Sequence, residues 1–135
     1  MPVYTVLTGP DELTAAERSE IAREITRIHT TLTGAPKSFV RIVFSSLSAG
    51  QTFTAGEPTA LTLLHGSIRA GRSRETKTRL LEEISAMFMR VTGIAARDLV
   101  VSISDIAAQD VMEGGKTLPE PQQEAEWLAR YDYQR

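Results

Sequence analysis

The second residue of this 135-residue chain could supply a catalytic group. Once Met1 is removed, Pro2 would carry a free secondary amine, which can accept and release a proton near neutral pH. Proline is also common as the first residue of a strand, because it has no N–H to donate to a sheet. The apolar run Val3–Leu7 follows it here. The two explanations of Pro2 are compatible, so its role depends on the side chains around it.

Two arginines lie three positions apart in the segment Gly66–Ser73, which we expect to be a glycine-rich loop between a strand and a helix. Guanidinium groups bind carboxylates through paired hydrogen bonds. Arg69 and Arg72, just before a helix N-terminus, therefore predict an anion site. The simpler alternative is a solvated basic loop.

The two histidines differ in their surroundings. His29 lies at the edge of an apolar helical stripe, so it is either a core residue or a group that holds or protonates an anion. His65 ends a predicted strand, and we interpret it as structural. The two belong to separate elements without the spacing of metal ligands, so the sequence predicts no metal site.

Carboxylates gather around the end of the last predicted strand. Asp105, Asp110 and Glu113 lie in or beside the segment Ala107–Gly115. One carboxylate is enough for general acid–base chemistry when its surroundings tune its pKa. The residues alone leave the choice among the three open, and an ordinary surface turn is the alternative.

Two similar halves are expected to position these side chains. In the first half, a helix separates the predicted strands Val3–Leu7 and Phe39–Phe44. Either Asp11 or Thr14 caps this helix, and Gly34 ends it. Apolar residues at helical spacing indicate the buried face of the helix: Ile21, Ile25, Ile28 and Leu32.

The second half repeats the first at a constant offset of 59 positions. The predicted strands Leu61–Leu64 and Leu99–Ile103 flank a helix that Ser73 caps and Gly93 ends. The apolar stripes of the two helices align without a gap, in the pairs Ile21–Leu80, Ile25–Ile84, Ile28–Met87 and Leu32–Val91.

The same offset aligns His29 with Phe88. One half therefore places an aromatic ring at a position where the other half places an imidazole. This exchange singles out His29 as a candidate functional residue.

We therefore predict an α/β (α+β) fold of two tandem β-α-β units, at about 2–59 and 60–118, within a single domain 1–135. Each unit joins two parallel strands through a right-handed crossover helix. Side by side, the units form a four-stranded mixed sheet with both helices on one face. Strands that are apolar on both faces are typical of covered sheets, so we expect another subunit to cover the second face.

Two segments lie outside the repeat. The segment Ser45–Ala60 is predicted as a long polar loop. The tail 119–135 carries Trp127, Leu128 and Tyr131, which share one helical face. We expect this face to dock on the core or on a neighbouring subunit.

The composition narrows the class of protein. The chain is 41% hydrophobic and 24% charged, as in ordinary globular proteins. Its net charge of −2 gives no electrostatic case for binding nucleic acid or an anionic membrane. The absence of cysteine excludes disulfides, thiol nucleophiles and iron–sulfur clusters. Without a visible signal peptide or an apolar membrane span, we expect a cytoplasmic protein.

Together these features resemble the tautomerase superfamily, whose members use an amino-terminal proline, and within it the cis-3-chloroacrylic acid dehalogenase group. The resemblance extends from residue 1 to about residue 128. The stretches that carry it are Met1-Pro2-Val3-Tyr4, His29 with Leu32-Thr33-Gly34, His65-Gly66-x-x-Arg69-x-Gly71-Arg72-Ser73, Ala108-Gln109 with Glu113, Leu118-Pro119 and Glu126-Trp127.

The resemblance implies a role for each matching residue. Pro2 would be the catalytic amine. Arg69 and Arg72 would hold the carboxylate of a small substrate, with His29 assisting them, and Glu113 would position or activate a water molecule. The resemblance also implies a homotrimer that needs no cofactor.

One position departs from the dehalogenase pattern. Those enzymes use a tyrosine on the last strand, and the matching residue here is Ser102. A serine hydroxyl could still contact the substrate, but it cannot reach as far as a phenol. The departure therefore counts against efficient dehalogenation.

The resemblance favours enol–keto tautomerisation of small 2-oxo or enol carboxylic acids, with Pro2 as the proton shuttle. Hydration or dehalogenation of a cis-3-haloacrylate, or a related decarboxylation, is the alternative. Further alternatives are an oxygen-dependent conversion of a bound enol and a non-catalytic trimer used for protein contacts. Arg69 and Arg72 would lower the pKa of Pro2 and Glu113 would raise it, so the sequence leaves open whether Pro2 acts as a base or as an acid.

Overall fold

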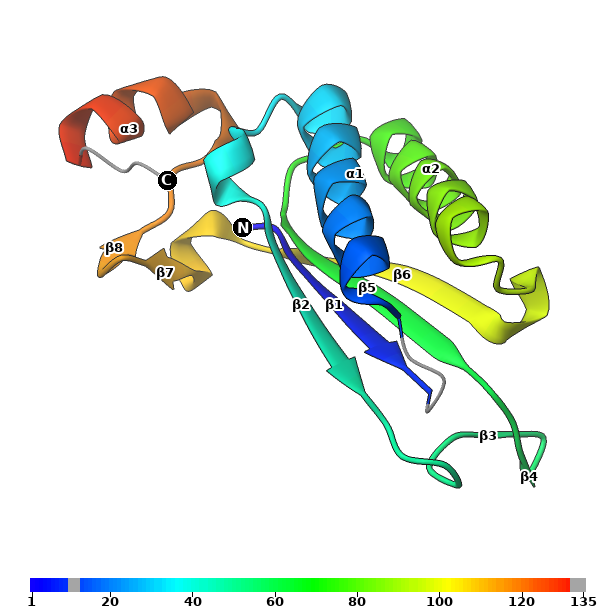
Figure 1. Cartoon of the computed structure of the whole chain (residues 1–135). Coiled ribbons are helices and arrows are strands. Elements are labelled where there is room, and N and C mark those ends of the chain that lie inside the picture. Colours follow the sequence, from blue (N-terminus) through cyan, green and yellow to red (C-terminus); the bar gives the residue numbers. More distant parts are fainter. Residues whose placement is uncertain (10–12, 132–135) are drawn as a thin grey trace.

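A four-stranded mixed sheet forms the centre of the computed structural model, which describes residues 1–9 and 13–131. Its order is β2-β1-β5-β6, with β1 parallel to β2, antiparallel to β5, and β5 parallel to β6. Both long helices, α1 and α2, lie side by side on one face of this sheet (Figure 1). The predicted fold is confirmed. The bounds are β1 (Val3–Thr8), α1 (Ala15–Thr33), β2 (Arg41–Ser46), β5 (Thr62–Arg69), α2 (Arg74–Thr92) and β6 (Leu99–Ile106).

Helix α1 begins with a capping box. The Glu17 amide donates to Thr14 Oγ1 at 3.0 Å, and the Thr14 amide donates to Glu17 Oε1 at 2.9 Å. This exchange satisfies two amide groups that an uncapped helix would leave without partners. Gly34 ends the helix in the left-handed conformation, with φ of 76°. Thr14 is thus the cap, while Asp11, the other candidate, lies outside the described residues.

The second half reproduces these elements at the same offset. Helices α1 and α2 each contain 19 residues, and Ser73 and Gly93 cap α2 where Thr14 and Gly34 cap α1. Because β1 and β5 are adjacent and antiparallel, the two halves lie head to tail across the middle of the sheet. The end where β1 begins is therefore the end where β5 finishes.

The core fills the space between the helices and the sheet. Tyr4 and Val6 of β1 and Leu64 and Ile68 of β5 point toward the helices and are fully buried. Each such side chain contributes about 1.5–3 kcal/mol when it is removed from water. The helices contribute the apolar stripes found in the sequence: Ile21, Ile25 and Ile28 from α1, and Leu80, Ile84, Met87 and Phe88 from α2.

The face of the sheet opposite the helices carries exposed apolar side chains. Val43, Leu63 and Val100, one each from β2, β5 and β6, are 53%, 36% and 48% exposed. Exposed apolar side chains gathered on one face of a sheet are common where a protein interface forms.

We predicted that the segment Ser45–Ala60 is a long loop, and this prediction is only partly correct. It contains a hairpin of the short strands β3 (Phe53–Thr54) and β4 (Glu57–Pro58). Its two turn residues, Ala55 and Gly56, both have positive φ, which is the geometry of tight hairpin turns.

The prediction of a loop over Gly66–Ser73 is also wrong for the first half of that segment. Residues 66–69 belong to β5, and Gly66 pairs with Tyr4 on one side and with Ile103 on the other. The glycine makes room for an aromatic ring rather than for a turn. A Cβ on Gly66 would lie 2.8 Å from Cδ1 of Tyr4.

The chain after β6 returns to the start of β1. It forms a turn η3 (Ala108–Asp110), a hairpin of β7 (Met112–Glu113) and β8 (Lys116–Thr117), a turn η4 (Pro121–Gln123) and a helix α3 (Glu124–Tyr131). Trp127 of α3 is buried, with its ring centroid 5.8 Å from that of Phe39, and its indole N–H donates to the Thr117 carbonyl at 2.9 Å. The predicted docking of the tail on its own core is thus confirmed as far as residue 131. Residues 132–135 of the tail lie outside the described residues.

No helix within the described ranges 1–9 and 13–131 is long and apolar enough to span a bilayer.

The contact between Gly66 and Tyr4 yields a prediction. Gly66→Ala should lower the free energy of unfolding by about 1–3 kcal/mol, because the added methyl group must displace the buried ring of Tyr4. Urea denaturation measures this effect. Ser67→Ala is the matched control, since its side chain points to the opposite face of the same strand. Equal stability of the two variants would mean that the strands separate at this point without cost.

Candidate active site

The topology brings the predicted functional residues to one end of the sheet. Val3 at the start of β1 pairs with Ser67 near the end of β5, and Arg69 at that end pairs with Ile106 at the end of β6. The chain then turns through η3 into β7, which carries Glu113. The amino terminus therefore lies beside β7 (Figure 1).

The amino terminus is held by a carboxylate. The Met1 ammonium group donates to Glu113 Oε2, and Arg41 Nε donates to Glu113 Oε1 at 3.1 Å. Burial lowers the pKa of this amine, as do Arg69 and Arg41, although Glu113 acts in the opposite direction. Of the three carboxylates considered from the sequence, Glu113 is thus the one that reaches the chain start.

Arg69 is buried, with a side chain only 1% exposed. Its guanidinium group donates to the Pro119 carbonyl at 2.8 Å and contacts Glu124 Oε1, and it lies over the Phe39 ring at 5.2 Å. All three partners come from segments outside the strands and long helices. The docked tail is therefore what makes burial of this charge possible.

Arg72 lies close enough to share the same carboxylate. Its Nη1 donates to the Thr33 carbonyl at 2.8 Å, and its Nη2 is 3.8 Å from Glu124 Oε1. A single carboxylate oxygen thus interacts with both arginines. The anion that the two arginines share here is a carboxylate of the chain itself, and their binding of a substrate anion stays a prediction.

Sequence reasoning missed two charged members of this cluster. Glu124 begins α3, and its only signal was an acidic position at the start of a tail helix expected to dock. Arg41 begins β2 and pairs with Val3, so its position follows from the strand register. Neither residue lies in a motif that the sequence could have identified.

His29 is buried at the same end, with 2% of its surface exposed. The Tyr4 hydroxyl is hydrogen-bonded to His29 Nδ1 at 2.8 Å. Burial, together with the positive charges of Arg72 and Arg69, lowers the pKa of His29 to about 3. Burial also raises the pKa of Tyr4. Both groups are therefore uncharged at neutral pH and available for neutral hydrogen bonds.

Three of the remaining candidates lie outside this cluster. Ser102 is on the sheet face opposite the helices, where its hydroxyl lies 2.7 Å from His65 Nδ1. Asp105 accepts a hydrogen bond from Lys77 Nζ at 2.9 Å. Asp110 is an exposed residue of η3. Within one chain, none of the three joins the cluster at the amino terminus.

Comparisons with known proteins identify the family of this chain. Residues 1–131 match the family described as "Putative oxalocrotonate tautomerase enzyme". The chain belongs to the tautomerase superfamily. The search of curated proteins found no match.

Three solved structures illustrate the range of similar superfamily members. Native Ps01740 is 40% identical with a TM-score of 0.80, and the match covers 82% of this chain and 99% of that one. N1, a member of the cis-3-chloroacrylic acid dehalogenase family, is 32% identical with a TM-score of 0.89, over 94% and 90% of the two chains. A fused 4-OT described as an asymmetric trimer is 26% identical with a TM-score of 0.77, over 85% and 94%.

The lowered pKa of His29 predicts an acid-sensitive fold. In the unfolded chain, His29 becomes protonated as the pH falls below its ordinary pKa of 6.5. In the folded chain, His29 stays neutral until the pH falls to about 3. Stability is therefore lost as the pH falls through this window, by about 2 kcal/mol between pH 6.5 and pH 5. His29→Phe, which copies Phe88 of the other half, should remove this part of the pH dependence.

Urea denaturation at pH 7.5, 6.0 and 5.0, at one protein concentration, gives the slope of the free energy of unfolding against pH. His65→Gln is the control, because His65 is the other histidine and its substitution should leave the slope in place. An unchanged slope in the His29→Phe variant would show that another group causes the acid sensitivity.

Proposed function

We propose that the protein, once Met1 has been removed, is a cofactor-independent tautomerase of small 2-oxo or enol carboxylic acids, with Pro2 as the group that moves the proton. The observation that carries this proposal is the convergence of the chain start with Arg69, Arg72 and Glu113 at one buried end of the sheet. Membership of the tautomerase superfamily supports it.

The proposed reaction gives separate roles to the arginine pair, the Pro2 amine and His29. The arginine pair holds the substrate carboxylate through charge-assisted hydrogen bonds. The Pro2 amine takes the proton of the enol O–H, and the electrons of the carbon–carbon double bond then take a proton from the resulting ammonium group. The O–H bond breaks, a C–H bond forms, and the amine returns to its starting state. Neutral His29 offers a hydrogen bond to the substrate without adding charge.

The electrostatics favour the amine as a base. The pKa of the Met1 amine is lowered, mainly by burial. We infer that the same surroundings would act on Pro2 after Met1 is removed, since Pro2 would then carry the terminal amine at this end of the sheet. An amine that is unprotonated at neutral pH suits abstraction of the enol proton.

Hydration or dehalogenation of a 3-haloacrylate is the second candidate, because Glu113 lies against the terminal amine. A carboxylate in that position could activate a water molecule while a protonated amine supplies a proton to carbon. The similarity to N1, which is described as a member of the cis-3-chloroacrylic acid dehalogenase family, supports the same possibility.

We also propose a homotrimer, as described for the fused 4-OT relative. The exposed apolar face formed by Val43, Leu63 and Val100 supports this assembly. Ser102 lies on that face. It could therefore contact substrate only in a site to which a neighbouring copy contributes.

The proposal predicts that Pro2→Ala lowers the rate of ketonisation of a phenylenolpyruvate-type enol about tenfold or more, because the freely rotating amine of alanine replaces an amine that the proline ring holds in a fixed position. The absorbance of the enol gives the rate, and intact-mass analysis verifies loss of Met1 in both proteins. Pro58→Ala in β4, at the opposite end of the sheet, is the matched control.

Equal rates for the wild type and Pro2→Ala would contradict the proposal, as would full activity in protein that retains Met1. Halide release from a cis-3-haloacrylate that is lost in Glu113→Gln, with no enol ketonisation, would favour the second candidate instead.

Because Glu124 interacts with both arginines, we predict that its replacement raises the affinity for substrate and lowers the stability of the fold. Glu124→Gln removes the negative charge that competes with substrate for Arg69 and Arg72, so KM should fall about threefold or more. The same change leaves buried Arg69 without its counter-ion, so the melting temperature should also fall. Initial rates and thermal unfolding measure the two effects.

Glu126→Gln, on the same helix, is the control for a general effect of the tail. A KM that rises in Glu124→Gln would show that Glu124 orients the arginines for substrate rather than competing with it.

A further inference from the structure

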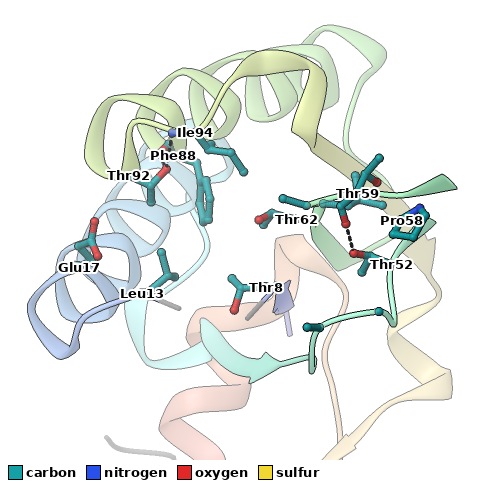
Figure 2. A pocket seen from close by; sticks show the side chains of 15 residues that line it. Thr8, Leu13, Glu17, Thr52, Pro58, Thr59, Thr62, Phe88, Thr92 and Ile94 are labelled. Carbon is teal, nitrogen blue, oxygen red and sulfur yellow. Dashed lines mark hydrogen bonds between the residues drawn. The ribbon is translucent and has the colours of Figure 1, made fainter. Parts of the chain in front are cut away.

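A cavity lies at the end of the sheet opposite the amino terminus. Figure 2 shows the side chains that line it. It has a volume of about 500 Å³ and lies between the end of β1, the start of β5, the end of α2 and the β3–β4 hairpin. This volume is within the range of small-molecule sites.

The internal repeat relates this cavity to the candidate active site. At the offset of 59, Leu61 takes the place of Pro2 and Phe88 takes the place of His29, while Leu13 corresponds to Arg72. All three of Leu61, Phe88 and Leu13 line this cavity. The cavity thus has leucine or phenylalanine at the positions that correspond to Pro2, His29 and Arg72.

Two threonines that are largely buried contribute hydroxyl groups to this lining. Thr8 and Thr62, on the adjacent strands β1 and β5, line the cavity and are only 7% and 5% exposed (Figure 2). Among the described residues, no hydrogen bond joins either hydroxyl to a protein group. The hydroxyl of Thr92, which also lines the cavity, instead donates to the Phe88 carbonyl at 2.7 Å. Because both hydroxyls lack a protein partner among the described residues and line the cavity, each can bond to whatever molecule fills it.

The charges around the cavity exclude the proposed substrates of the first site. Within the described part of the chain, its lining contains no lysine, arginine or histidine. Glu17 is its only ionisable residue, and the Glu17 carboxylate already accepts the Thr14 amide at 2.9 Å. A carboxylic acid would lose its hydration here and gain no cation in return.

We propose that this cavity is a binding site for an uncharged, ring-sized molecule with one hydroxyl or carbonyl group. The ring packs against Phe88 and the neighbouring aliphatic side chains. The polar group of the ligand bonds to the Thr8 and Thr62 hydroxyls. The site is separate from the amino-terminal one and does not depend on the function proposed for it.

Methyl NMR of the full chain tests the proposal, with 4-methylphenol as the probe. The methyl signals of Leu13, Leu61 and Ile94 should shift in a saturable way as the phenol is added. 4-Methylbenzoate, which has the same ring and a carboxylate in place of the hydroxyl, should leave these signals unchanged. Thr62→Val, which keeps the shape of the side chain but removes the hydroxyl, should weaken phenol binding about threefold to tenfold.

Two controls separate binding from folding. Thr62→Val should be at least as stable as the wild type, because the Thr62 hydroxyl has no partner among the described residues. Thr26→Val on α1 is a matched substitution outside the cavity and should leave phenol binding unchanged. The proposal is overturned if the phenol does not shift the three methyl signals, if the benzoate shifts them equally, or if Thr62→Val leaves the affinity unchanged.

Discussion

Burial of the Arg69 guanidinium group is the constraint on which the amino-terminal end of the molecule depends. A charge that is almost entirely removed from water needs a counter-ion, hydrogen-bond acceptors and polarisable contacts. None of these comes from the repeated units apart from the Phe39 ring. The Pro119 carbonyl and Glu124 both belong to the chain after β8. The tail is therefore needed to complete this end of the sheet, and Trp127 fixes it there by packing on Phe39.

The concentrated positive charge then sets the protonation of its neighbours. Arg69 and Arg72 reinforce the effect of burial on His29, and Arg69 acts in the same direction on the terminal amine. These effects lower the pKa of both groups, which favours the unprotonated form that a base or a neutral hydrogen-bonding group requires. Glu113 acts the other way at the amine, so the balance between arginine and glutamate decides whether this end favours proton abstraction or proton donation.

Much of the fold could be predicted because the same pattern of strands and helix occurs twice in the sequence. The periodic apolar stripes and the capping residues Thr14, Gly34, Ser73 and Gly93 define the same helix in each half, and agreement between the halves is stronger than either pattern alone. The predictions failed around Gly66, where a glycine next to basic residues is typical of a loop. The strand continues there because β1 and β6 supply partners on both sides, and because the glycine accommodates the Tyr4 ring.

The site was harder to predict than the fold, for a related reason. Arg69, Arg72 and His29 could be identified because they interrupt a repeat or form a recognisable pair. Glu124 has no counterpart in a repeat and becomes important only through the docking of α3 on a distant part of the chain. Long-range charge pairing of this kind leaves no local pattern in the sequence.

The duplication also explains why one end of the sheet is charged and the other apolar. Both halves build the same strand–helix–strand backbone, but only the first strand starts at a chain terminus. The equivalent residue of Pro2 in the second half is Leu61, whose nitrogen is a peptide amide and has no basicity. Arginines buried beside an inert amide would retain the cost of desolvation without serving an amine. Replacement of Arg72 by Leu13 and of His29 by Phe88 at the equivalent positions removes that cost. Within the described part of the chain, the cavity there has threonine hydroxyls and the Glu17 carboxylate as its polar side-chain groups.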